Sequence, residues 1–178
     1  MNHPSAPNAP CFLLPHICDT VRLRFCRQCA AITLSDPAPC CFQFKSGCLC
    51  AAPQLEELRL MPQRNCCDAC LHSTLCLPVS LRLCKDCEAF TLHGTIRLPV
   101  QTMLRTAHSP GMQYIVQAEL CLADVQTQDG CLCALFDLTA TLYAVLLQPV
   151  HLPVSCAPCP PERPPYFNLP LYPQLPQR

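Results

Sequence analysis

The amino-acid sequence predicts a mainly β protein, in which antiparallel hairpins form a sandwich or two small packed sheets and a proline-rich, extended C-terminal tail follows. Two observations predict this fold class. Apolar and polar residues alternate over long stretches, as in half-buried strands, and helix signals are scarce. Because a hairpin with one apolar face must bury that face, we expect a second layer to pack against the first.

The composition divides the chain of 178 residues into three segments. Residues 1–10 form a lead that we expect to be disordered. Residues 11–150 form a cysteine-rich body, which allows a division into sub-units at about 11–50 and 66–150. In residues 151–178 prolines recur too often for a helix or a central strand, so we expect an extended tail that is disordered or loosely docked.

Three stretches of the body predict β-hairpins of one plan, with apolar residues at every second position on both sides of a turn. The last of them contains Asp129-Gly130, a dipeptide that favours hairpin turns. Three related hairpins indicate a repeated β unit. They are expected at 21–34 with the turn at Cys26–Cys29, at 79–100 with the turn at Cys84–Cys87, and at 114–146 with the turn at 128–130.

The strongest helix signal is the segment Pro53–Leu60. It begins with a proline, which the first turn of a helix tolerates, and it is rich in leucine and glutamate. Pro62 follows closely and would end the helix. We therefore expect one or two helical turns at this point and no other helix.

Cysteine is the most unusual feature of the composition, at 19 of 178 residues. Such a share normally marks disulfide scaffolds, but these are short secreted chains. The N-terminal residues lack the basic region and the apolar run of a secretory signal, so we expect synthesis in the cytosol. Thiols stay reduced there, and C-x-x-C pairs more often bind metal. The alternative is oxidation after assembly, and the odd count then favours links between chains.

The cysteines cluster at the expected turns and loops, in C-x-x-C pairs, C-x-C pairs and adjacent doublets. Adjacent cysteines rarely bridge each other, so a doublet favours two separate partners. This arrangement can join several strands or chains. The candidates for cross-linking are Cys26, Cys29, Cys40, Cys41, Cys66, Cys131, Cys133, Cys156 and Cys159.

The sharpest local pattern is Cys67-x2-Cys70 and Cys84-x2-Cys87, separated by thirteen residues. Two such pairs can close a tetrahedral zinc site, with each pair on a hairpin turn. A zinc ion would add on the order of 10 kcal/mol to folding, against roughly 2–4 for one disulfide. The glycine that usually follows each pair is absent, and cross-linked or buried thiols are the alternative.

No catalytic constellation is present in the sequence. The chain has no G-x-S-x-G, P-loop or G-x-G-x-x-G motif, and its six histidines are scattered. No C-x-x-C pair precedes a helical pattern, as a disulfide oxidoreductase would require. We therefore expect no enzymatic activity, and no cofactor other than zinc.

Charge and hydropathy narrow the range of partners. The formal net charge is zero, which argues against nucleic-acid binding. The longest apolar stretch, around Ala140–Leu147, is far shorter than the roughly 20 residues of a membrane helix. With only 13% charged residues, the chain is expected to associate with itself or with other proteins.

The sequence resembles uncharacterised cysteine-rich proteins of anaerobic Firmicutes. The resemblance rests on L-P-V phrases beginning at Leu77, Leu98 and Leu152, on cysteines at turns, and on the tail phrase Asn168–Pro173. In style it is also similar to spore coat and spore appendage proteins. The resemblance implies a protein made in the mother-cell cytosol, assembled on the spore surface and hardened by intermolecular disulfides.

Two functions therefore remain as hypotheses. The first is a structural β protein that self-associates through cysteines and exposed strand edges. The second is a zinc-stabilised module that binds a protein partner. A composition rich in Leu, Cys and Pro and poor in Gly also occurs in reading frames that are not expressed, and the sustained strand alternation argues against this third interpretation.

Overall fold

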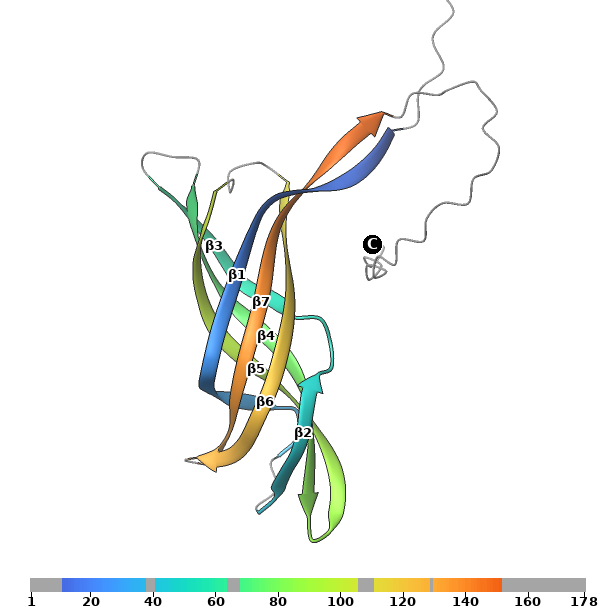
Figure 1. The fold of residues 1–178 in the computed structure, drawn as a ribbon, viewed down its shortest axis with the longest axis vertical. Coiled ribbons are helices and arrows are strands. Elements are labelled where there is room, and N and C mark those ends of the chain that lie inside the picture. Colours follow the sequence, from blue (N-terminus) through green and yellow to red (C-terminus); the bar gives the residue numbers. More distant parts are fainter. Residues whose placement is uncertain (1–10, 38–40, 64–67, 106–110, 129, 152–178) are drawn as a thin grey trace, which may run out of the picture. The chain divides into compact units, whose positions relative to one another are not determined.

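The computed structural model of the chain describes residues 11–37, 41–63, 68–105, 111–128 and 130–151 (Figure 1). The predicted lead and nearly all of the predicted tail lie outside these ranges. Residues 13–150 form one compact unit, and all that follows concerns this unit. It contains seven strands: β1 (Cys11–Leu34), β2 (Gln43–Leu49), β3 (Gln54–Pro62), β4 (Ala69–Lys85), β5 (Glu88–Leu104), β6 (Met112–Gln128) and β7 (Cys131–His151).

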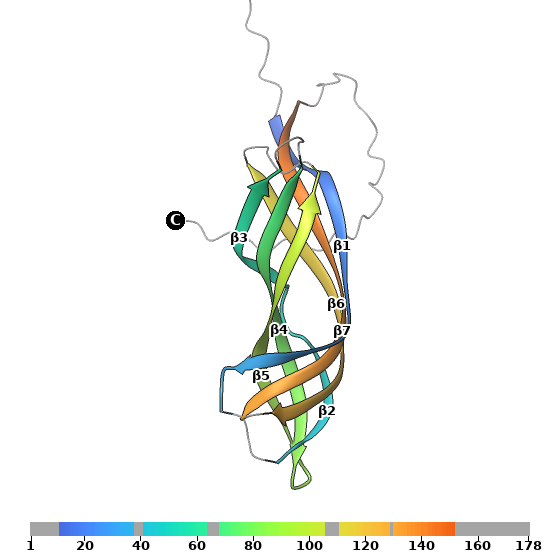
Figure 2. The same cartoon turned by 90° about the vertical axis from the view of Figure 1, so that its left-hand side faces the viewer.

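The strands form one sheet that folds into two layers. Its order is β2-β4-β5-β1-β7-β6, with β3 also paired to β4, and every described register is antiparallel. Figures 1 and 2 show β1, β7 and β6 side by side on one side of the unit and β3, β4 and β5 on the other. The predicted mainly β fold is confirmed.

Strand β1 connects the two layers. Most of it lies beside β7, and its last residues, 32–34, pair with residues 94–96 of β5. Arg27 lies between these two parts with a positive φ of 49°, and its amide donates a hydrogen bond to the carboxylate of Asp137 at 2.7 Å. A strand that passes between layers through a bend is how the corners of a β sandwich form. The bend is visible in Figure 2.

Two of the three predicted hairpins are confirmed. Strands β4 and β5 pair along their whole length, and Asp86 and Cys87 form the turn with positive φ at both positions, as a type I′ turn requires. Strands β6 and β7 form the second hairpin, with Gly130 at positive φ in its turn. The hairpin predicted at 21–34 is wrong. Cys26–Cys29 lies at the bend of one continuous strand, β1, because the partners of its two parts lie in different layers.

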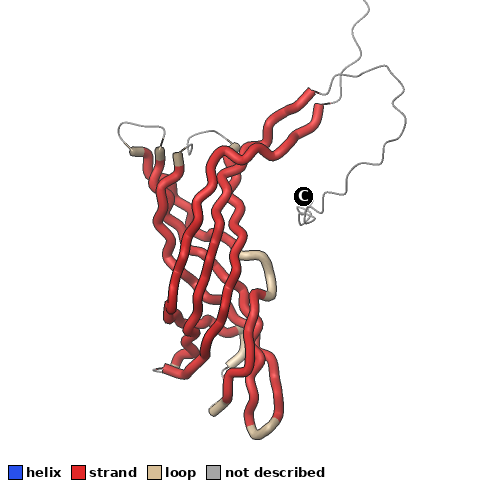
Figure 3. Tube along the Cα trace, viewed as in Figure 1, coloured by secondary structure: helices blue, strands red, loops and turns tan. Residues whose placement is uncertain are grey.

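The predicted helix at Pro53–Leu60 is also wrong, because residues 54–62 form β3. The described residues contain no helix (Figure 3). Leu55 and Leu60 of β3 both pack on the core, although they are five residues apart. An irregularity between Glu56 and Arg59 inserts one extra residue in β3 and hides the two-residue period. Pairing with β4 thus prevails over local helix propensity.

The core lies between the two layers. Every second residue of β4 from Leu75 to Leu83 is fully buried, and Phe136 and Leu138 of β7 face this row from the other layer. A smaller cluster, which contains Leu71 and Tyr114, fills the other end of β4. No helix in the described ranges has the length and apolar character needed to cross a membrane.

The two ends of the sheet meet where β2 approaches β6. A side-chain carbon added at Gly47 of β2 would lie 2.5 Å from Leu122 Cδ1 of β6. Glycine leaves room for this leucine methyl group, and any larger residue at position 47 would require the Leu122 side chain to move. The contact covers the core on the side opposite to the β1 bend.

Candidate functional site

The described cysteines lie mainly at the surface of the unit. In β4, alternation places Cys70, Cys76 and Cys84 on the outer face, although Cys70 and Cys76 are buried there by neighbouring side chains. Eight cysteines in the described ranges are exposed and none of these eight is in a disulfide. They are Cys26, Cys29, Cys41, Cys48, Cys50, Cys87, Cys121 and Cys131.

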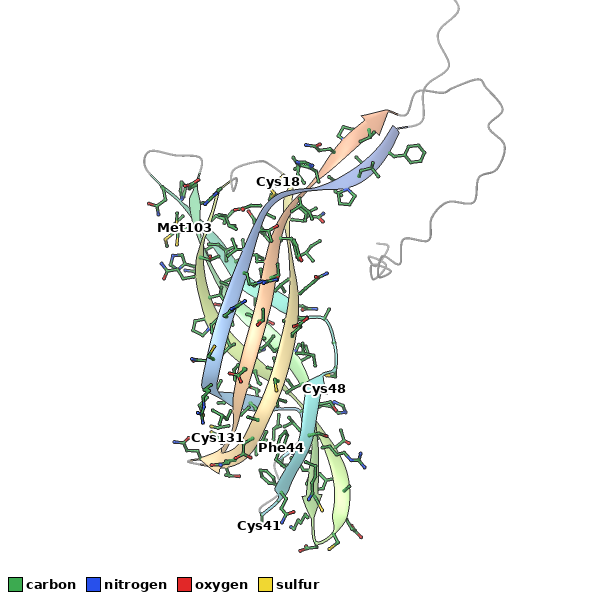
Figure 4. All side chains as sticks on the ribbon, in the orientation of Figure 1. Cys18, Cys41, Phe44, Cys48, Met103 and Cys131 are labelled. Carbon is green, nitrogen blue, oxygen red and sulfur yellow. The ribbon has the colours of Figure 1, made fainter. Side chains whose placement is uncertain are left out.

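Three thiols gather around one groove at the turn between β4 and β5. Cys41, Cys84 and Cys87 line this groove of about 520 Å³, together with Lys45 and Lys85. Cys87 is the second residue of the turn, and Cys84 is opposite Gln43 in the pairing of β4 with β2. Figure 4 shows Cys41 at the tip of β2 on this side of the unit. Two of these thiols are exposed and Cys84 is partly exposed, so all three are accessible to thiol–disulfide exchange.

A second groove runs over the outer surface of β1, β7 and β6. It has a volume of about 250 Å³, and Cys26 and Cys121 both line it. Asp137 lies between the two thiols, since it is opposite Cys121 in the β6–β7 pairing and accepts the hydrogen bond from Arg27. This bond holds the bend of β1 against β7 and places Cys26 at the surface.

The structure places the predicted cross-linking cysteines as follows. Cys26, Cys29, Cys41 and Cys131 are exposed, and Cys133 is partly buried. Cys40, Cys66, Cys156 and Cys159 lie outside the described residues. Sequence reasoning left four exposed thiols out of that set: Cys48, Cys50, Cys87 and Cys121.

The alternation of apolar and polar residues in β6 already indicates that Cys121 is exposed. It lies between Leu120 and Leu122, which pack on the core, and is therefore on the opposite, outward face. For Cys87 the signal is its place in the predicted turn, because residues in tight hairpin turns are normally exposed.

The predicted four-cysteine zinc site does not form in this arrangement. Cys70 and Cys84 lie near opposite ends of β4 and are separated by about 45 Å at roughly 3.3 Å per residue. Thiolates that share one zinc ion lie within about 4 Å of each other, because each Zn–S bond is about 2.3 Å. Cys67 lies outside the described residues, and Cys87 is at the Cys84 end. The prediction is wrong because the thirteen intervening residues form one extended strand.

No group of three or more His, Cys, Asp or Glu side chains in the described ranges is arranged to hold a metal ion. Two thiols on the outer face of β4 are nevertheless buried, and their surroundings differ from those of the exposed thiols. Cys76 lies between Gln54 of β3 and Arg97 of β5. Burial raises the pKa of the Cys76 thiol, the Glu56 carboxylate raises it further, and Arg97 acts in the opposite direction.

The second buried thiol, Cys70, has two polar neighbours. Its Sγ lies 3.3 Å from Nε2 of His72 and accepts a hydrogen bond from Nε2 of Gln101 at 3.5 Å. Both neighbours are on the same outer face, because His72 is two residues along β4 and Gln101 is opposite His72 on β5. The surface of the unit thus carries two chemically different sets of thiols, one exposed and one shielded.

Comparison with known proteins finds no protein family, no curated protein sequence and no solved structure that matches the chain. The arrangement of its own residues must therefore carry any functional interpretation.

Proposed function

We propose that this chain is a structural β protein that self-associates through disulfides between its exposed cysteines. One observation carries the proposal: eight free thiols are exposed on different strands and turns of one unit. Cys48 on β2, Cys121 on β6 and Cys131 at the β6–β7 turn serve as examples. An exposed thiolate can attack a disulfide of another molecule and so form an intermolecular link. Exposed thiols on several strands and turns allow links to several neighbours.

Exposed apolar residues support the same proposal. The N-terminal part of β1 and the C-terminal part of β7 run side by side in Figures 1 and 2. Leu13 and Ile17 of β1 are 63% and 55% exposed, and Leu14 and Leu147 are also exposed. Exposed apolar side chains of this kind favour association, because burying them removes apolar area from water. Disulfides could then form between chains already held together.

The resemblance to spore coat and appendage proteins suggests a setting for this chemistry. A chain made in a reducing cytosol keeps its thiols free until it reaches its place in a surface layer, where oxidation links neighbouring copies. In this setting the exposed thiols are the functional groups and the β unit is the rigid support that presents them.

The proposal is tested by purifying the full chain anaerobically with reductant and then oxidising it in air. We expect reduced monomers or weak oligomers that become covalent multimers on a non-reducing gel and return to monomers with dithiothreitol. A variant with serine at the eight exposed positions should form far fewer multimers, while the matched control C76S should form as many as the parent. An oxidised parent chain that stays monomeric overturns the proposal.

A further inference from the structure

A row of three sulfur-containing side chains crosses the outer surface of β3, β4 and β5. Met61 of β3 is opposite Cys70 of β4, and Cys70 is opposite Met103 of β5. Directly opposite residues of paired strands project to the same face, with Cβ atoms about 4.5–5.5 Å apart. The adjacent positions Leu71 and Leu104 are fully buried in the core, so this row is on the outer face.

An imidazole lies beside the middle of this row. His72 shares the outer face with Cys70, and its Nε2 is 3.3 Å from Cys70 Sγ. The registers therefore place two thioether side chains, one thiol and one imidazole at neighbouring positions of the same outer face. Met103 projects from β5 at this end of the unit in Figure 4.

The exposure of these side chains is unusual for the outer face of a sheet, because the cysteine is buried and the larger methionines are exposed. Cys70 is only 7% exposed, whereas Met61 and Met103 on either side of it are 51% and 46% exposed. Few large apolar side chains in the described ranges are as exposed as these two, and both border the same thiol. A plain packing role would favour methionines folded onto the core, since leaving apolar side chains in water forfeits their burial energy.

The chemistry of the donors selects the ligand. Thioethers and thiolates are soft donors that favour Cu(I), whereas zinc takes thiolate, imidazole and carboxylate, and calcium and magnesium take oxygen. We propose that Met61, Cys70, His72 and Met103 bind one Cu(I) ion. Binding replaces the thiol proton of Cys70, which passes to solvent, and copper stays in the +1 state throughout.

This site does not rest on the proposed function, because Cys70 is shielded and is not one of the exposed thiols. Either conclusion can fail without the other. The exposed thiols would, however, bind Cu(I) themselves and obscure the measurement. The test therefore uses the full chain with serine at the eight exposed positions and at the partly exposed Cys18, Cys84 and Cys133. Serine also replaces the six cysteines whose side chains are not described: Cys11, Cys40, Cys66, Cys67, Cys156 and Cys159.

The measurement is an anaerobic titration with Cu(I), followed by the methyl resonances of the methionines in NMR spectra. The chain has four methionines, which makes the two at the site easy to distinguish. We expect the first equivalent to shift the methyl groups of Met61 and Met103 and to leave that of Met112 on β6 unchanged. If the serine chain does not fold, the parent chain is used after its exposed thiols have been alkylated in the folded state.

Affinity gives the second readout, by competition with the Cu(I) chelator bathocuproine disulfonate. The double variant M61L/M103L keeps the side-chain volume and removes both thioethers, and we expect it to bind at least about tenfold more weakly, the smaller end of the loss that even outer partners of a metal site cause. The control M112L should bind as the parent does. Unshifted Met61 and Met103 methyl groups, or unchanged affinity in M61L/M103L, overturn the proposal.

Discussion

Each end of β4 carries a cysteine on the outer face of the sheet, but the two cysteines differ in their exposure to solvent. Cys70 at one end is buried, whereas Cys84 at the other end is partly exposed and borders a groove with two further thiols. The difference comes from the neighbouring strands. Cys70 lies between two methionines, whereas Cys84 is opposite Gln43 of β2 and Ala89 of β5. Cross-strand neighbours, rather than the strand itself, therefore determine whether a thiol is accessible.

The two cysteines can be compared in this way only if β4 is one continuous strand whose alternate residues face the core. A substitution of Leu77, in the middle of β4, tests this most strongly. Leu77 is fully buried in the main core. We expect Leu77→Ala to lower the free energy of unfolding by about 2–5 kcal/mol, as other large-to-small core substitutions do. Urea unfolding followed by circular dichroism measures the change.

The matched control is Ser80→Ala, three residues along β4 on the partly exposed outer face. It should change the free energy of unfolding by no more than about 0.5 kcal/mol. Equal effects of the two substitutions would mean that the alternation of β4 is not as described.

Thiol reactivity compares the two ends directly. Under reducing conditions, alkylation of the folded chain should modify Cys84 and Cys87 at least about a hundredfold faster than Cys70 and Cys76, because the buried thiols react only after local opening. Mass spectrometry of peptides after timed quenching gives the rate at each position. Similar rates at Cys70 and Cys84 would remove the distinction between the two ends.

The sequence predicts the regions around Cys84 better than those around Cys70. Strands β4 and β5 follow directly from alternation and a two-residue turn, and the exposure of Cys87 follows with them. Strand β3 covers one side of Cys70, and its bulge breaks the alternation, so the local pattern there predicts a helix instead of a strand. The bend of β1 resembles a hairpin turn in the sequence, because local signals do not show which layer a strand pairs with.

Prediction of the candidate sites from the sequence is limited in the same way, because local signals do not show which strands pair. The zinc site was predicted from the spacing of cysteines along the chain, which assumes that the chain returns between the two pairs. The row Met61, Cys70 and Met103 could not be predicted, because it depends on the registers of β3 and β5 against β4. Register is set by the pattern of whole strands and by bulges, and not by the few residues at the site.

The core beneath the Cys70 end has a defect that a substitution can remove. Tyr114 packs on the cluster around Leu71, and its hydroxyl is the one buried side-chain polar atom in the described ranges without a hydrogen-bond partner. An unpaired buried hydroxyl costs about 1–3 kcal/mol. We expect Tyr114→Phe to raise the free energy of unfolding at pH 7 by about 1 kcal/mol in urea unfolding experiments.

The pH dependence of Tyr114→Phe provides a further check. Burial raises the pKa of Tyr114 above its ordinary value of 10.0. The neutral form is therefore favoured by folding, and this stabilisation is present below the unfolded pKa and is lost as the pH rises through the folded pKa. The parent should lose this stability at alkaline pH and the variant should not, so identical alkaline profiles would contradict the shielding of Tyr114.

The smallest expected effect on stability concerns the ion pair beside Cys76. Glu56 and Arg97 are 3.5 Å apart and about half exposed, so Glu56→Gln should change the free energy of unfolding by less than about 0.5 kcal/mol.

The same substitution should change the pKa of Cys76 in a definite direction. The Glu56 carboxylate raises the pKa of the Cys76 thiol, so Glu56→Gln should lower that pKa, and Arg97→Gln should raise it. A titration of the Cys76 Cβ resonance by NMR separates the two variants. An unchanged pKa of Cys76 in both variants would mean that burial alone controls this thiol, and that the charged neighbours on β3 and β5 do not act on it.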